Sequence, residues 1–203
     1  MADPRVTTAT SGFEGVHRFW DGGFNKTMAK ILPGEYYVSE GQDLVTTILG
    51  SCVSACVRHV KYPLGAMNHF LLPDAGGDGS AVDAPHRYGA YAMEHMLNEL
   101  FKKGARKSDL EVKIVGGGAV MQSSARVGGR NIEFVKNYLE NEQLRVVSED
   151  VGDSVARRVV YDVTNGRMLV KHLPVEASLA EEESRYANSV ASQEDSGGDV
   201  ELF

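Results

Sequence analysis

The sequence predicts an α+β fold, a single layered domain in which mixed or antiparallel β-sheets pack with two main helices. Short segments rich in β-branched and aromatic residues lie toward both ends of the chain, as is typical of strands. Two segments between them carry apolar residues at helical spacing. Because strands and helices do not alternate regularly, a doubly wound parallel sheet is disfavoured.

Length and composition indicate one globular domain with polar ends. The 203 residues are 42% hydrophobic and 24% charged, which are ordinary fractions for such a domain. Residues 1–12 are small, polar and without periodicity, so we expect a flexible N-terminus. Residues 176–203 are acidic and rich in serine, and we expect a disordered tail there. The folded domain is therefore expected to span residues 13–175.

The net charge of −7 comes from the tail, because the residues from Glu176 onward include eight acidic residues and one basic residue. The rest of the chain is balanced, which argues against a nucleic-acid partner, since such binding needs a basic face. No apolar run is long enough for membrane insertion and no secretory signal is visible, so we expect a cytoplasmic protein. In that reducing compartment the two cysteines are expected to be free thiols.

The N-terminal part is predicted to form four strands. Residues 35–39 (EYYVS) and 43–49 (DLVTTIL) are rich in strand-forming residues and flank the loop EGQ. Residues 53–58 alternate between apolar and polar side chains, and residues 65–72 (GAMNHFLL) follow the turn KYPL. These last two segments are predicted to pair as a hairpin.

Helices are predicted in the middle of the chain. From Tyr91 onward apolar residues recur on one helical face until Gly104, which is suited to end the helix. Residues 111–115 (EVKIV) predict a strand, and a second helix is expected to begin near Arg130. The glycine run at 116–118 lacks the lysine of a phosphate-binding loop, so we expect it to permit close backbone packing.

The C-terminal part of the domain is predicted to be β again. The strand-like segments are residues 144–150, 156–163 and 167–173. The last two are joined through the sequence TNG, in which Asn165 and Gly166 are predicted to supply positive φ for a tight hairpin turn.

The segment TTILGSCVSAC, residues 46–56, has the features of a nucleophile turn. Gly50 allows a sharp turn, so that the backbone N–H groups near Ser51 and Cys52 can point outward as an oxyanion hole. His69, amid apolar residues, is a candidate base for the Cys52 thiol. Cys56 lies in the middle of a strand pattern, where burial would make its thiol inert.

Hairpin geometry leaves the choice of cysteine open. If the strands fold symmetrically about KYPL, facing residue numbers sum to about 125, which pairs His69 with Cys56 and leaves Cys52 nearly four residues away. A bulge or bend near the glycine would bring Cys52 back. A zinc site of Cys52, Cys56, His59 and His69 is a further alternative, although its ligands would lie on diverging faces of a strand.

Longer segments carry a family resemblance. They are PGEYYVSEGQDLVTTILGSCVSACVRH, GAMNHFLLPD, RYGAYAMEHMLNELFKKGA, KIVGGGAVM, VGGRNIEFVKNYL and GRMLVKHL, in this order between about Lys30 and Leu173. Together they resemble the CheD family, the chemoreceptor glutamine deamidases of bacterial chemotaxis. The resemblance implies that Cys52 is the nucleophile, that His69 is the base, and that Thr46 orients His69.

The resemblance also implies a reaction and its partners. A cysteine-dependent amidohydrolase of this family converts glutamine side chains of methyl-accepting chemoreceptors to glutamate, releasing ammonia through a thioester and using no cofactor or metal. The alternative is a non-catalytic regulatory partner of the CheC phosphatase. The sequence departs from the family at His59, where aspartate is expected, and at Asp153 and Ala156, where glycines are usual. These departures concern a turn or a partner surface, since none belongs to the triad.

Overall fold

The computed structural model describes residues 3–72, 83–120 and 125–174, together with Glu181, Glu183, Arg185 and Tyr186. The strands are β1 (His17–Asp21), β2 (Lys26–Lys30), β3 (Tyr36–Ser39), β4 (Asp43–Leu49), β5 (Val53–His59), β6 (Gly65–Asn68), β7 (Leu110–Gly116), β8 (Arg145–Val151), β9 (Ala156–Asp162) and β10 (Arg167–Leu173). The helices are α1 (Asp83–Lys102), the 3₁₀ turn η1 (Lys107–Asp109) and α2 (Ala125–Asn141).

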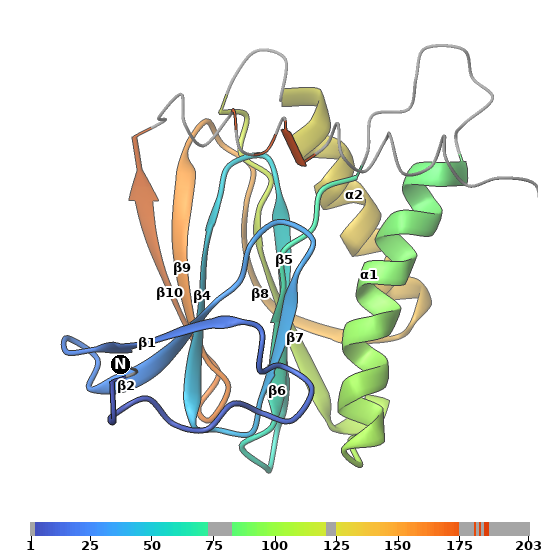
Figure 1. Ribbon diagram of the computed structural model, residues 1–203. Helices are drawn as coiled ribbons and strands as arrows, with labels where there is room; N and C mark the ends of the chain where they lie inside the picture. Colours follow the sequence, from blue (N-terminus) through green and yellow to red (C-terminus); the bar gives the residue numbers. More distant parts are fainter. Residues whose placement is uncertain are drawn as a thin grey trace, which may run out of the picture.

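These strands form two mixed sheets of five strands each, in the orders β1-β2-β4-β9-β10 and β3-β6-β5-β7-β8. The pairs β2–β4 and β7–β8 are parallel, and the other pairs are antiparallel. Figure 1 shows the sheets side by side, with both helices beyond the second sheet. There α1 packs on β3 and β6 while α2 packs on β5 and β8. The predicted α+β class, with layered mixed sheets and two main helices, is confirmed.

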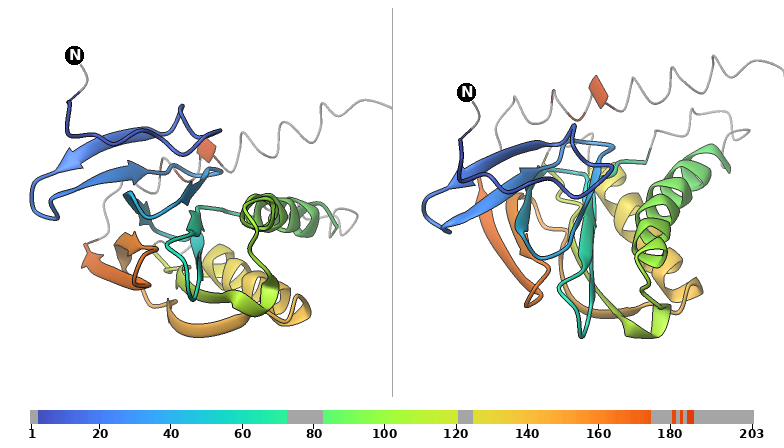
Figure 2. Two further views of the ribbon diagram at one scale, coloured as in Figure 1. Left: turned by 90° about the horizontal axis from the view of Figure 1, so that it is seen from below. Right: turned by 60° about the horizontal axis from the view of Figure 1, so that its bottom comes forward.

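The core lies within these layers because the second sheet is covered on both faces. In β5 every residue except Arg58 is buried, including its polar Ser54. Such a strand faces the first sheet on one side and the helices on the other, and Figure 2 shows the two helices lying together on that side. Phe13 closes one end of the core, where its ring meets the rings of Tyr36 and Tyr37 edge to face.

The N-terminal segment contacts the first sheet well before residue 13. The backbone N–H of Thr7 donates to Thr27 Oγ1 at 3.0 Å, and the Thr7 hydroxyl donates to the Asp43 carboxylate. Asp43 is itself buried and paired with Arg18 at 3.0 Å, so this contact helps to satisfy a buried charge. Thr10 is buried as well. Although we expected residues 1–12 to be flexible, part of this segment is packed on the domain.

The end of α1 agrees with the sequence prediction, whereas the start of α2 does not. Gly104, with φ +92°, follows the end of α1 as predicted, and its N–H donates to the Phe101 carbonyl. By contrast α2 begins at Ala125 rather than near Arg130. The early turns of α2 contain Gly128, where a Cβ would lie 2.6 Å from the Gly117 carbonyl oxygen. The glycine that lowers the helical propensity of this segment is therefore required for close packing.

The last hairpin differs from the two-residue turn predicted at Asn165 and Gly166. Four residues separate the paired Asp162 and Arg167, and the N–H of Gly166 donates to the Asp162 carbonyl. Gly166 alone of the two takes a positive φ, of +70°. A longer loop therefore replaces the type of turn that Asn-Gly usually forms.

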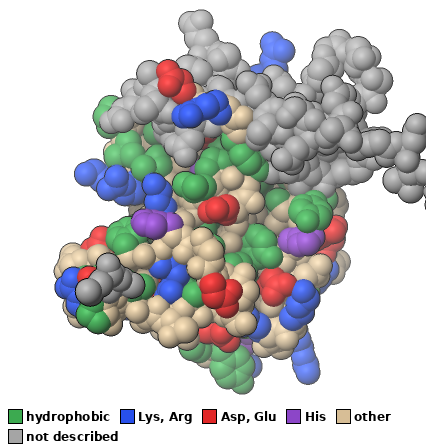
Figure 3. Space-filling model, in the orientation of Figure 1, with side chains coloured by type: hydrophobic (Ala, Val, Ile, Leu, Met, Phe, Trp, Pro, Cys, Tyr) green, Lys and Arg blue, Asp and Glu red, His purple; other side chains and the backbone are tan. Residues whose placement is uncertain are grey.

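The surface is of mixed character. On the face shown in Figure 3, acidic, basic and apolar side chains are interspersed over the described part of the molecule. Within the described ranges, neither helix has the length and apolar character needed to cross a membrane.

Candidate active site

Cys52 lies where the chain crosses from one sheet to the other. It follows Gly50 and Ser51, which lead out of β4 in the first sheet, and it immediately precedes β5 in the second. Its side chain is buried, at 0% exposure. The sharp turn predicted at LGSC is therefore the link between the two layers.

The carbonyl groups of this turn are all held from one side. Gly118 N–H donates to the Gly50 carbonyl and Gly117 N–H to the Cys52 carbonyl, both at 2.7 Å. Asn131 of α2 donates through Nδ2 to the Ser51 carbonyl at 2.8 Å. Because the three carbonyls point to this side, the N–H groups of the same residues converge on the other.

The glycine run 116–118 makes these contacts possible. Gly116 has φ +112°, and a Cβ there would lie 2.3 Å from the Cys52 carbonyl oxygen. A Cβ on Gly118 would lie 2.4 Å from the Val155 carbonyl oxygen. Real side chains do not fit at such separations, so the prediction that this run permits close backbone packing is confirmed.

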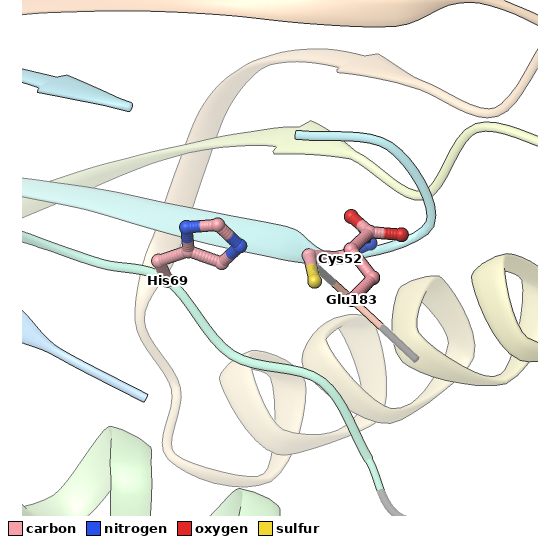
Figure 4. Close-up of side chains that lie close together, drawn as sticks. All are labelled: Cys52, His69 and Glu183. Carbon is pink, nitrogen blue, oxygen red and sulfur yellow. The ribbon is translucent and has the colours of Figure 1, made fainter. Parts of the chain in front are cut away.

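The hairpin that carries Cys52 and His69 has a different register from the symmetric one. Cys56 faces Met67 and Val53 faces Phe70, so facing residue numbers sum to 123. His69 is then level with Ser54, and Cys52 and Cys56 are both its diagonal neighbours. Cys52 Sγ, a ring nitrogen of His69 and a carboxylate oxygen of Glu183 all lie within 4.8 Å of one another. Figure 4 shows these three side chains facing one another.

Thr47 fixes the tautomer of His69. Its hydroxyl donates to the Ile31 carbonyl at 2.8 Å and lies 2.8 Å from His69 Nδ1. A hydroxyl has one proton, so both contacts are satisfied only if Nδ1 carries a proton and donates it to Thr47. Nε2 is then unprotonated, and in Figure 4 it is the ring nitrogen that faces Cys52. Nε2 is buried and accepts no hydrogen bond from the described residues.

This arrangement corrects the role expected of Thr46. Its hydroxyl donates to the Val159 carbonyl at 2.7 Å, across the first sheet and away from the histidine. Thr46 and Thr47 are consecutive residues of one strand, so their side chains point to opposite faces. In the structure the contact with His69 therefore belongs to Thr47, for which no pattern in the sequence is a signal.

Burial sets the protonation of His69. The loss of hydration lowers the pKa of its imidazole to about 4, and the neighbouring Glu183 carboxylate only partly opposes that effect. The ring is therefore neutral near pH 7, with a lone pair on Nε2 directed toward the thiol. A neutral imidazole in this position can accept the proton of a thiol.

Glu183 occupies the convergent amides of the turn. Its carboxylate accepts hydrogen bonds from the N–H groups of Gly50 at 2.8 Å, Ser51 at 2.9 Å and Cys52 at 3.2 Å. The Ser51 hydroxyl donates to it as well, at 2.6 Å. These amides are the ones expected to form an oxyanion hole, and here they hold a negative oxygen. The sequence offered no signal for this residue, because it lies in an acidic run.

The ionised form of Glu183 is favoured despite its burial. Its side chain is only 4% exposed, and the loss of hydration alone would raise its pKa. Taken together, the hydrogen bonds from Ser51, Cys52 and Gly50 have a larger effect than the loss of hydration, and they lower the pKa of Glu183 below its usual value. The turn is thus a built site for a carboxylate or another oxyanion.

Part of the expected tail is therefore packed into the domain. Tyr186 is partly buried against the core and lies over Gly34, where a Cβ would meet its hydroxyl oxygen at 2.2 Å. Gly34 in turn donates its N–H to the His69 carbonyl at 2.7 Å. Apart from Glu181, Glu183, Arg185 and Tyr186, the disordered tail predicted for residues 176–203 lies outside the described residues.

The other cysteine has a different environment. Cys56 is fully buried in the middle of β5, and the loss of hydration raises the pKa of its thiol. His59 ends the same strand, and its Nδ1 accepts from the N–H groups of Lys61 and Tyr62. The zinc site considered from the sequence is therefore not assembled. Cys52, His69 and Glu183 could each offer one ligand atom to a metal ion, but the Glu183 oxygens already accept four hydrogen bonds.

Comparison with known proteins identifies the family. A family model described as CheD chemotactic sensory transduction matches residues 71–172. The chain is 44% identical over 195 residues to a probable chemoreceptor glutamine deamidase CheD of Hahella chejuensis, covering 94% of this chain and 92% of that protein. The chain belongs to the CheD family. A CheD of Janthinobacterium with the same description is 49% identical, covering 91% of this chain and 93% of that protein.

Structural comparison adds little to this assignment. A Neisseria meningitidis protein of the DUF152 family model has 12% identity and a TM-score of 0.38, covering 66% of this chain and 62% of that chain. This likeness is too slight to carry an argument.

Two departures from the expected CheD pattern, Asp153 and Ala156, have a clear structural basis. Asp153 adopts φ +58°, a left-handed conformation that glycine, asparagine and aspartate tolerate best. Its carbonyl accepts from the Ala119 N–H at 2.7 Å. Ala156 is buried at the start of β9, so the glycine expected there is replaced by the next smallest side chain. The turn therefore keeps a glycine-like conformation without the glycine.

Proposed function

We propose that this CheD protein is a chemoreceptor glutamine deamidase in which Cys52 is the nucleophile and His69 the general base. The observation that carries the proposal is the meeting of three groups. A buried thiol, an unprotonated imidazole nitrogen and three convergent amides lie together at one turn. Thioester chemistry requires a nucleophile, a base to activate it and donors for the oxyanion.

The first half of the reaction forms the thioester. His69 Nε2 takes the thiol proton, and the Cys52 sulfur attacks the carbon of a glutamine side-chain amide. The amide oxygen becomes negative in the tetrahedral intermediate and takes the place that the Glu183 carboxylate holds here. The imidazolium returns its proton to the nitrogen, the C–N bond breaks, and ammonia leaves. Thr47 accepts from Nδ1 throughout and keeps Nε2 directed toward the sulfur.

The second half of the reaction regenerates the thiol. A water molecule enters where ammonia left, and His69 Nε2 removes one of its protons as the oxygen attacks the thioester. The oxyanion forms again on the amides of the turn. Collapse breaks the C–S bond, the sulfur recovers a proton from the imidazolium, and the product is a glutamate side chain. One amide and one water are thereby converted into one carboxylate and one ammonium ion.

The two cysteines provide a matched test. We expect Cys52→Ala to abolish ammonia release from receptor protein, while Cys56→Ala retains most of it, since Cys56 lies in the core with a raised thiol pKa. Mass spectrometry of the receptor should find the glutamine-to-glutamate conversion with the Cys56 variant alone. An equal loss in a Cys56→Ala protein with normal thermal unfolding would contradict the assignment of the nucleophile.

A CheC-type phosphatase as a regulatory partner is a separate proposal, and only the family resemblance supports it. A pull-down between the two purified proteins tests it directly. Binding by the Cys52→Ala variant with unchanged affinity would show that such a role does not depend on turnover.

A further inference from the structure

The carboxylate in the active site has the chemistry of the reaction product. Deamidation of glutamine yields a glutamate side chain, whose carboxylate is formed on the amides of the turn beside Cys52. Glu183 is a glutamate whose carboxylate rests on the amides of Gly50, Ser51 and Cys52, with His69 on its other side. Its position is that of a product side chain before release.

We propose that the C-terminal segment carrying Glu183 is an intrinsic, product-like ligand of the active site, and that it must withdraw before a substrate glutamine can enter. This inference rests on the proposed deamidase function and adds to it a competitor supplied by the chain itself. The site that would hold a glutamine oxygen cannot hold the Glu183 carboxylate at the same time, because both need the same N–H groups.

A second contact anchors the segment. Tyr186 lies three residues after Glu183, and the described residues at both positions are helical. Side chains at this spacing share one face of a helix. Glu183 enters the amides of the turn while Tyr186 covers Gly34, whose N–H holds the carbonyl of His69. The segment therefore contacts both the nucleophile turn and the backbone that positions the base.

The same geometry indicates how a substrate is presented. Glu183 reaches a buried site from a helical segment, with a side chain of the same length as that of glutamine. A glutamine exposed on a receptor helix can therefore be held in the same way, with one helix replacing another. Because the intrinsic ligand is tethered, it competes at an effective concentration on the order of millimolar. Substrate must overcome that competition at every turnover.

Glu181 offers a matched control in the same segment. Its side chain is exposed and carries the same charge, whereas that of Glu183 is buried. In the full-length chain, Glu183→Ala should expose Cys52 and lower the apparent KM for a receptor-derived glutamine peptide by about tenfold, with kcat unchanged, because a tethered competitor raises KM alone. Glu181→Ala should match the wild type in both respects.

The rate at which iodoacetamide alkylates Cys52 reports whether the Glu183 segment occupies the active site, and this measurement does not depend on catalysis. We expect Cys52 to be alkylated about tenfold faster in Glu183→Ala than in the wild type. This is the same factor as the expected decrease in apparent KM, because both measurements depend on how often the segment occupies the site. Cys56 in the same molecule should remain slow in every variant. Equal Cys52 alkylation and equal KM in wild type and Glu183→Ala, in a protein that deamidates the peptide, would overturn the proposal. Faster alkylation with no deamidation by any variant would instead overturn the proposed function alone.

Glu183→Gln tests the product-like placement itself. This variant delivers a glutamine to the site, and we expect mass spectrometry to find it converted to glutamate. The double variant Glu183→Gln/Cys52→Ala should keep its glutamine. If Glu183→Gln deamidates the added peptide but leaves its own residue 183 unchanged, the side chain at this position does not bind as a substrate does, and the proposal fails.

Discussion

The paired threonines of β4 allow a stringent test of how His69 is positioned. Thr47→Val is nearly isosteric and removes the hydroxyl that joins the Ile31 carbonyl to His69 Nδ1. Both partners are then left buried without this hydrogen bond, at a cost of about 1–3 kcal/mol for each group. Since a valine methyl fills the same space and adds no packing loss, we expect the free energy of unfolding to fall by roughly 2–6 kcal/mol in total.

The expected loss of activity is larger than the loss of stability implies. Without Thr47, His69 can exchange its tautomers or rotate, and Nε2 is no longer held as an acceptor toward Cys52. A positioned general base contributes about 10²–10⁴ to a rate, so we expect kcat to fall about 10²-fold in Thr47→Val. Thr47→Ser keeps the hydroxyl and should restore most of the activity, which a purely structural defect would not predict.

Thr46→Val is the matched control for this experiment. It removes one hydroxyl from the adjacent residue, whose single hydrogen bond goes to the Val159 carbonyl. We expect a stability loss of about 1–2 kcal/mol and a kcat within about twofold of wild type, because nothing at His69 changes. Ammonia release from a receptor peptide and urea denaturation measure the two effects. A larger loss of kcat in Thr46→Val than in Thr47→Val would refute the assignment of the positioning residue.

Two further predictions concern stability. Gly129 has open space around it in α2, so Gly129→Ala should stabilise the protein by about 0.5–1 kcal/mol through helix propensity. Gly128→Ala should destabilise it, because its Cβ would lie 2.6 Å from the Gly117 carbonyl oxygen. Urea denaturation measures both effects, and equal effects of the two substitutions would contradict the close packing at Gly128. Burial lowers the pKa of His69 from 6.5 to about 4, so the unfolded state binds the extra proton between these values. Stability is then full above pH 6.5 and falls toward pH 4 by up to about 3 kcal/mol. His69→Gln should flatten this slope, and a slope that persists in this variant would assign the effect to other groups.

Local sequence patterns predicted the architecture well. The strands from β3 onward and the C-terminal part of α1 follow from alternation, helical spacing and the position of Gly104, which are signals that the chain carries within a few residues. The strands β1 and β2 and the start of α1 at Asp83 were not predicted. The start of α2 was missed because Gly128 lowers helix propensity locally. A glycine is favourable at residue 128 because the Gly117 backbone packs closely against it, and this contact cannot be predicted from a local sequence pattern.

The site was predicted in part. Cys52 was distinguished from Cys56 by its turn and by resemblance, while the hairpin arithmetic pointed the other way. The actual loop is closed by a hydrogen bond from His59 N–H to the Leu64 carbonyl, so its centre lies one residue earlier than assumed. That shift moves every facing pair by two residues. The register places Ser54 opposite His69 and leaves both cysteines two residues from it, so it removes the preference for Cys56 without by itself selecting Cys52.

The two remaining features depend on tertiary structure. Whether Thr46 or Thr47 faces His69 is decided by which face of β4 is turned toward the second sheet. Both residues are buried, so alternation of polarity gives no indication. Glu183 follows a stretch that composition alone would leave unfolded, and its burial depends on the amides of a turn more than a hundred residues earlier in the chain.

The route of the chain through the two sheets has a consequence for biogenesis. Thr47 belongs to one sheet, His69 follows a strand of the other, and Cys52 lies at the crossing. The first sheet is completed only when β9 pairs with β4 and β10 pairs with β9, and these are the last strands in the order of synthesis. The surroundings of Cys52 therefore depend on strands from both ends of the domain, and they are complete only in a chain that has been synthesised through β10.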